Sequence, residues 1–179
     1  MNDAIDMTLA ILRAEEGFRP WPYRCSRGVW TIGYGTAIEW GPLADTFDAL
    51  EAEGTLSASP SPGYRGSGPE PIRINAGLAE ALMRRRVSAD AAVLAKYPWY
   101  AAQTPERQAI LLSMAYQMGL SDLLLFRRTI AALEGGDYTE AAREMLDSRW
   151  ACQTPARAQR QAEAMRTGDI SYWIGGVAQ

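Results

Sequence analysis

The side chains best suited to chemistry gather between residues 15 and 36. The sequence contains no histidine, which excludes the serine and cysteine nucleophiles that need a histidine base. An enzyme built from this chain would depend on carboxylates, cysteine, serine, tyrosine or lysine. Glu16, Cys25 and Thr31 follow one another with eight and then five residues between them. If the segment after Glu16 folds back over it, the three side chains surround one cavity.

Each of these residues also has a purely structural interpretation. Glu16 could be an exposed acid at a helix end, Cys25 a small buried apolar side chain, and Thr31 an ordinary strand residue. The only other cysteine is Cys152, and two cysteines without histidine cannot close a tetrahedral zinc site. We therefore expect reduced thiols, no metal and no cofactor.

The residues before Glu16 predict the element that positions it. Apolar residues recur every three or four positions across residues 3–16, which predicts a helix that Gly17 ends. Glu16 would then lie at the negative end of the helix dipole, which disfavours an ionised carboxylate.

The residues after Glu16 predict a small β element. Strand-forming residues flank a Ser-Arg-Gly turn within residues 21–36, a pattern typical of a β-hairpin or meander. Gly33 and Gly35 indicate close approach of the backbone to a neighbour, or a bulge. Residues 40–72 then change in composition.

A weak helical pattern over residues 43–52 leads into a stretch rich in Ser, Pro and Gly, which indicates a loop. This loop is either a solvated insertion or a lip that contacts substrate through Tyr64 and Arg65.

The chain beyond residue 74 predicts helices joined by short loops. Caps, prolines and glycines place them at 75–96, 105–118, 121–134, 137–150 and 155–167. Such helices form a bundle. The expected fold class is therefore α+β, with a small N-terminal lobe (1–75), a larger helical lobe (76–179) and a cleft between them. We interpret residues 1–179 as a single domain and expect a monomer.

Composition and charge exclude several classes of protein. The 179 residues are 47% hydrophobic and 22% charged, which is ordinary globular usage and excludes disorder over the whole chain. No apolar run is long enough for a membrane span, and the first residues have no basic region typical of a secretory signal. The 18 basic and 21 acidic residues argue against nucleic acid as the main partner.

Two ordered motifs resemble the T-even phage lysozyme family, glycoside hydrolase family 24. In the first, over residues 12–35, the family's Glu-x8-Asp/Cys-x5-Thr pattern falls on Glu16, Cys25 and Thr31. The second begins more than 100 residues later and comprises Gln117-Met118-Gly119, Ser148-Arg149-Trp150, Gln153-Thr154-Pro155, Arg157 and Arg166-Thr167-Gly168. The resemblance covers nearly the whole chain except residues 40–72.

The resemblance implies a lysozyme-like fold and hydrolysis of the β-1,4 bond between N-acetylmuramic acid and N-acetylglucosamine in peptidoglycan. In the family's inverting scheme, Glu16 would be the general acid, and Cys25 would hold the position of the group that activates water. Thr31 would help to orient that water. Many members have Asp at the position of Cys25, and an ordinary cysteine is only about 3% thiolate at neutral pH. Thr36 stands where the family often has His.

The second motif implies substrate contacts. Tyr116 and Gln117 fall where the family lines its cleft with glycan contacts, and Arg157 falls where the family has a basic partner for the catalytic glutamate. The expected partners are peptidoglycan glycan strands, with a holin involved only indirectly. The resemblance implies a phage endolysin that stays in the host cytoplasm before release and acts in the periplasm. A lytic transglycosylase and a non-catalytic glycan-binding phage module are the alternative hypotheses.

Overall fold

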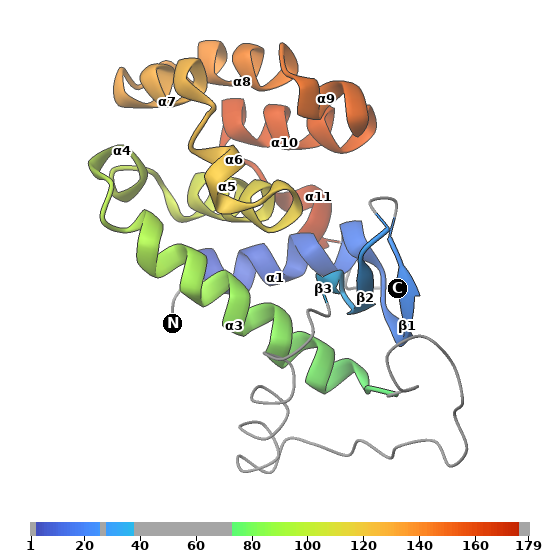
Figure 1. Cartoon of the computed structure of the whole chain (residues 1–179). Helices are drawn as coiled ribbons and strands as arrows, with labels where there is room; N and C mark the ends of the chain where they lie inside the picture. The colour runs from blue at the N-terminus through green and yellow to red at the C-terminus, as the bar shows by residue number, and fades with distance from the viewer. Residues whose placement is uncertain (1–2, 26–27, 38–72, 176–179) are drawn as a thin grey trace. The chain divides into compact units, whose positions relative to one another are not determined.

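A computed structural model describes residues 3–25, 28–37 and 73–175. It confirms the α+β class, with a small antiparallel sheet near the N-terminus and helices over most of the remainder (Figure 1). The elements are α1 (Asp3–Glu16), β1 (Arg19–Arg24), β2 (Trp30–Gly33), β3 (Thr36–Ala37), α3 (Ala76–Leu94), α4 (Pro98–Ala101), α5 (Pro105–Met118), α6 (Leu120–Leu123), α7 (Arg127–Glu134), α8 (Tyr138–Leu146), α9 (Arg149–Gln153), α10 (Pro155–Thr167) and α11 (Ser171–Ile174). The helical piece predicted at 43–52, and Tyr64 and Arg65, lie outside the described residues.

The chain divides into two compact units. The first comprises residues 1–15 and 86–179, and the second comprises residues 16–85. Helix α1 thus belongs almost entirely with the helices, although the sequence grouped it with the small lobe. One contact that ties it there joins Thr8 Oγ1 to the backbone oxygen of Ala109 in α5, at 3.4 Å. The single-domain interpretation and the cleft between two lobes stay predictions.

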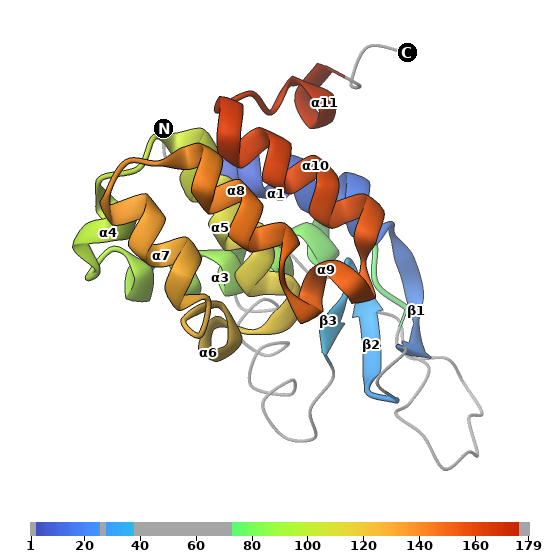
Figure 2. The same cartoon turned by 90° about the horizontal axis from the view of Figure 1, so that it is seen from above.

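Helix α10 is central to the first unit. It packs against α8, α5 and α9, and Figure 1 shows it between α8 and α5. Helix α7 lies beside α8, as the view in Figure 2 shows. The large side chains fully buried in these helices include Ile110, Leu111, Leu112 and Met114 of α5. Of the helices that the structure describes, none has the length and hydropathy of a membrane span.

Three of the five helices predicted beyond residue 74 are confirmed, as is the N-terminal helix predicted at 3–16. Those predicted at 105–118 and 155–167 have the expected first and last residues. The helix predicted at 75–96 ends two residues earlier, at Leu94. Its cap is as predicted, because Asn75 Oδ1 accepts a hydrogen bond of 2.7 Å from the backbone N–H of Leu78.

The predictions of continuous helices at 121–134 and 137–150 were wrong, because each segment is interrupted. The segment 121–134 breaks after α6 and resumes at Arg127, and the Phe126 ring packs edge-on against Trp150 with centroids 6.3 Å apart. The segment 137–150 breaks after Leu146. There Ser148 Oγ accepts a 3.1 Å hydrogen bond from the backbone N–H of Ala151 and so caps α9.

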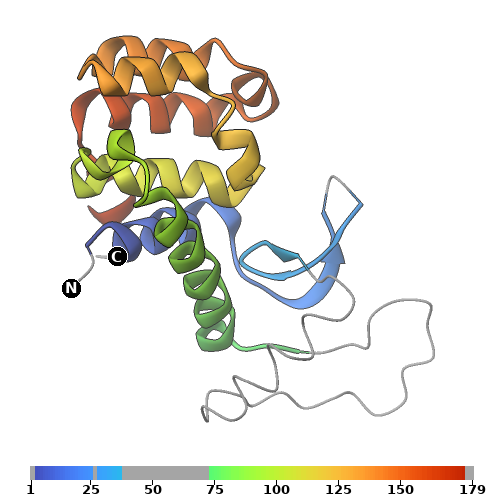
Figure 3. The same ribbon diagram turned by 60° about the vertical axis from the view of Figure 1, so that its left-hand side comes forward.

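The sheet of the second unit is a meander in the order β1-β2-β3 (Figure 3), one of the two arrangements that the sequence predicted. Ile32 of β2 is fully buried in a cluster with Ile74, Leu78, Ala79 and Leu82. The next residue confirms the close approach predicted for it. Gly33 has φ +66°, and a Cβ placed there would lie 2.8 Å from Ala79 Cβ.

Candidate functional site

Glu16 is the last residue of α1, as the sequence predicted. Gly17 follows with φ +66°, a left-handed conformation that ends a helix and that glycine adopts without strain. Glu16 is half-buried. Because α1 stops there, the chain turns directly into the strand that leads to Cys25.

Cys25 and Thr31 are held by the turn between β1 and β2. The backbone N–H of Cys25 donates to Val29 O at 3.0 Å, and the Cys25 carbonyl accepts from the N–H of Gly28 at 2.8 Å. Cys25 is half-buried, and Thr31 is 4% exposed. Thr31 Oγ1 donates to Val29 O at 3.1 Å. Both residues are thus tied to the backbone of the same turn.

Tyr23 connects the three predicted residues. It pairs directly with Thr31 across β1 and β2, so the two side chains lie on the same face of the sheet. Burial raises the pKa of the Tyr23 hydroxyl, the charge of Arg19 opposes this, and the charges of Glu16 and Cys25 raise the pKa further. Glu16 and Cys25 therefore both lie within electrostatic reach of this hydroxyl. The pairing of Tyr23 with Thr31 is thus observed, and the cavity that Glu16, Cys25 and Thr31 were expected to surround stays a prediction.

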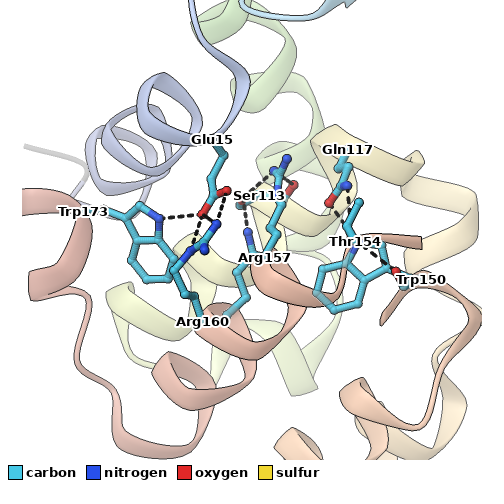
Figure 4. A network of polar contacts seen from close by, with 9 residues as sticks. Glu15, Ser113, Gln117, Trp150, Thr154, Arg157, Arg160 and Trp173 are labelled. Carbon is cyan, nitrogen blue, oxygen red and sulfur yellow. Dashed lines mark hydrogen bonds and ion pairs between the residues drawn. The ribbon is translucent and has the colours of Figure 1, made fainter. Parts of the chain in front are cut away.

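Glu15, the neighbour of Glu16, has a different environment in the first unit. Its carboxylate accepts hydrogen bonds from Arg160 of α10, the shortest at 2.7 Å, and from the Trp173 indole of α11 at 2.9 Å. Figure 4 shows both donors converging on the Glu15 carboxylate. The Glu15 side chain is only 8% exposed.

The partners of Glu15 keep its carboxylate ionised. Burial alone would raise the pKa of Glu15. The hydrogen bonds from Arg160 and Trp173, with the charges of Arg157 and Arg160, outweigh burial and lower the pKa below its ordinary value. A carboxyl held in this form is a poor proton donor, so of the two adjacent glutamates Glu15 is unsuited to general-acid catalysis.

Arg157 of α10 lies within electrostatic reach of this carboxylate. Its guanidinium is buried and donates to Ser113 Oγ on α5 at 3.2 Å. The same hydroxyl oxygen accepts a 2.9 Å hydrogen bond from the amide of Gln161. The charge of Arg157 acts on Glu15. Its expected pairing with Glu16 stays a prediction.

Gln117 anchors a second polar group in the first unit, also drawn in Figure 4. Its Oε1 accepts a 2.8 Å hydrogen bond from the Trp150 indole, and its Nε2 lies 3.4 Å from Thr154 Oγ1. These contacts join residues that the sequence placed in one motif. Tyr116 is half-buried on α5. Glycan contacts at Tyr116 and Gln117 stay predictions.

The described residues offer no group of three or more His, Cys, Asp or Glu side chains that could hold a metal ion. Cys152 is exposed on α9, and no disulfide joins it to Cys25.

Sequence reasoning missed two features of this region. It treated Tyr23 only as a strand former, although its spacing from Thr31 across a tight turn is a signal that the two could pair. It also missed the contact of Glu15 with Arg160 and Trp173. The two adjacent glutamates were the visible signal, but their partners lie 145 and 158 residues away along the chain.

Comparison with known proteins gives a family match over most of the chain. The family model described as phage lysozyme matches residues 13–164. A probable T4-type lysozyme 1 from Dictyostelium discoideum is 28% identical over 170 residues, which cover 91% of this chain and 95% of that protein. The pre-baseplate central spike protein Gp5 of Enterobacteria phage T4 is 29% identical over 178 residues, which cover 97% of this chain but 30% of the spike protein.

Proposed function

Because the chain belongs to the phage lysozyme family, we propose that it hydrolyses the β-1,4 bond between N-acetylmuramic acid and N-acetylglucosamine with Glu16 as the general acid. The family and the T4-type relative make the chain a glycoside hydrolase, a peptidoglycan-hydrolysing muramidase. The reacting groups that we propose all belong to the second unit.

The observation that carries this assignment is the contrast between two adjacent carboxyls. Glu15 is bound by Arg160 and Trp173, and its pKa is lowered. Glu16 is the half-buried last residue of α1, and its charge reaches the hydroxyl of Tyr23, which pairs with Thr31 across the sheet. A positioned acid that protonates the leaving oxygen accelerates such reactions by about 10²- to 10⁴-fold.

In the proposed reaction, Glu16 donates its proton to the glycosidic oxygen as the bond between that oxygen and the anomeric carbon breaks. A water molecule attacks the anomeric carbon from the opposite face, and Cys25 accepts the proton that the water loses. Thr31 is suited to orient this water, because its hydroxyl hydrogen is donated to Val29 O. The Thr31 oxygen can therefore accept a hydrogen bond from the attacking water.

We propose glycan contacts for Tyr116 and Gln117. The Gln117 carbonyl oxygen is fixed by the Trp150 indole, and its amide nitrogen carries two hydrogens, of which the Thr154 contact uses one. The other can donate to a sugar hydroxyl. We propose Arg157 as the basic partner of Glu16, supported by its buried guanidinium and by its effect on the adjacent Glu15.

We also propose that the enzyme accumulates in the host cytoplasm and acts in the periplasm after a holin has opened the membrane. The location of the substrate supports the second part, because peptidoglycan lies outside the inner membrane. Fractionation of cells before and after lysis, followed by immunodetection, tests the route.

Mass spectrometry of digested peptidoglycan tests the reaction type. Hydrolysis adds one water for each bond cleaved and leaves a new reducing end, so we expect muropeptides with reducing N-acetylmuramic acid. Anhydro products, lighter by one water, would show a transglycosylase instead. Binding to peptidoglycan with no new reducing ends would show a non-catalytic module.

A further inference from the structure

We propose that strand β1 carries a second substrate contact, which binds the acidic peptides attached to the glycan rather than its sugars. We call this surface the Arg–aromatic edge and define it as Arg19, Trp21, Tyr23 and Arg73. All four residues belong to the second unit. The inference rests on the proposed function, because it takes peptidoglycan to be the ligand.

The Arg–aromatic edge consists of two guanidinium groups that each lie over an aromatic ring. The Arg19 guanidinium carbon is 4.4 Å from the centre of the Tyr23 ring. That of Arg73 is 6.0 Å from the Trp21 ring. The backbone N–H of Ile74 donates to Pro20 O at 3.0 Å, which places Arg73 beside β1.

The exposure of these side chains suits them to bind a ligand. Trp21 is 45% exposed, and both arginines are exposed. In the part of the chain that the structure describes, neither Arg19 nor Arg73 makes an ion pair with a carboxylate, whereas Arg160 does. A guanidinium held over a ring keeps N–H donors for a carboxylate, and the closer contact of Arg19 with Tyr23 reduces the freedom of that side chain before binding.

The backbone of β1 restricts how a ligand could bind. β1 is an edge strand of the sheet, a position where an extended peptide can add as a further strand, but its Pro20 carbonyl already accepts from the N–H of Ile74. Pro20 and Pro22 lie within β1 and have no N–H to donate to such a strand. Recognition at this edge must therefore come from side chains, which here are two cations and two aromatic rings.

Charge complementarity favours a short acidic peptide over other anionic ligands. Anionic membranes and nucleic acids are bound by many basic residues spread over a wide surface, yet this chain has a net charge of −3. Two guanidiniums, one on β1 and one beside it, suit the few carboxylates of one peptide. The aromatic rings add apolar contact for its aliphatic parts.

Sedimentation with purified peptidoglycan tests the proposal. Binding is measured with the Glu16→Gln variant, so that cleavage does not alter the peptidoglycan. The substitutions Arg19→Gln and Arg73→Gln are then made together in that variant. We expect the double substitution to weaken binding to intact sacculi by about 3- to 10-fold, given the modest strength of exposed ion pairs. Binding to glycan strands stripped of peptides by an amidase should not change. The Arg85→Gln/Arg127→Gln pair, which removes two exposed charges elsewhere, is the matched control.

Other outcomes would overturn the proposal. Equal weakening on stripped strands would show that the edge binds sugars, and equal weakening by the control pair would show a general effect of charge. Unchanged binding would show that the Arg–aromatic edge takes no part in binding peptidoglycan. Sedimentation with anionic phospholipid vesicles, if it responds to the same substitutions, would assign the edge to membrane surfaces. Reducing-end release by the wild type is measured separately, so failure of the proposed function is distinguishable from failure of this contact.

Discussion

Glu15 Oε2 lies 2.7 Å from Nη2 of Arg160, and these residues are 145 positions apart in the sequence. Arg160 also reaches the other carboxylate oxygen through Nε and Nη2, at 3.1 and 3.0 Å. The pair therefore has the bidentate geometry of a strong arginine–carboxylate contact. It fastens the last turn of α1 to α10, immediately before the proposed catalytic acid.

Arg160→Met should destabilise the protein. The substitution leaves the nearly buried Glu15 carboxylate without its main partner, so the free energy of unfolding should fall by about 2 kcal/mol. Urea denaturation of both proteins measures this. The control is Arg166→Met on the same helix, whose partner Glu163 is exposed; it should change stability little. Equal effects of the two substitutions would show that the Glu15 contact is an ordinary surface pair.

The same contact predicts how stability depends on pH. Because the pKa of Glu15 is lowered in the folded protein, its stabilising effect is complete above the ordinary carboxyl pKa of 4.5 and is lost as pH falls through the lower folded-state pKa. The difference in unfolding free energy between wild type and Glu15→Gln should therefore shrink from about pH 5 to about pH 3. Urea denaturation across this range measures it. A difference that grows toward acid would contradict the lowered pKa.

Gly33→Ala should disrupt the packing of the sheet on α3. The new Cβ would lie 2.8 Å from Ala79 Cβ, and φ is +66°, so steric overlap adds to backbone strain. We expect a loss of about 3 kcal/mol in unfolding free energy. Gly28→Ala is the control, because φ is +74° there but nothing lies within 4 Å; it should lose only about 1 kcal/mol. Similar losses at both positions would argue against close packing at Gly33.

Cys25→Asp should retain activity within about 10-fold of the wild type, whereas Cys25→Ser should lose about 100-fold. Aspartate can accept a proton, and it suits the first position of the turn that the Cys25 carbonyl closes with Gly28. A serine hydroxyl is too weak a base. Initial rates of reducing-end release give both values. If serine were the better substitute, Cys25 would not be the general base.

The sequence correctly predicted the helices whose ends are marked by nearby capping residues, prolines or glycines. Thr104-Pro105 and Gly119 flank α5, and the helix has the predicted ends. No glycine or proline marks the breaks after Leu123 and Leu146. At the first, the Phe126 ring packs on the distant Trp150, and a sequence window of one or two turns does not contain that contact.

In the candidate site, too, the sequence predicted what depends on nearby residues and missed what depends on distant ones. The order of Glu16, Cys25 and Thr31 follows from a helix end and a tight turn, which are local features. The distinction between Glu15 and Glu16 depends on Arg160 and Trp173, which approach α1 only in the folded chain. Sequence spacing therefore predicted where Glu16 and the turn lie along the chain, and the fold was needed to show which side chains bind the Glu15 carboxylate.

Comparison of Glu16→Gln with Glu15→Gln tests the central claim most directly, with muropeptide release and unfolding free energy measured on both. We predict that Glu16→Gln lowers the rate of release at least about 100-fold at a temperature where the variant is folded. Glu15→Gln should lower stability and keep most of the activity at a temperature where it is folded. Full activity in Glu16→Gln, or the loss of activity in a folded Glu15→Gln alone, would contradict the assignment of Glu16 as the general acid.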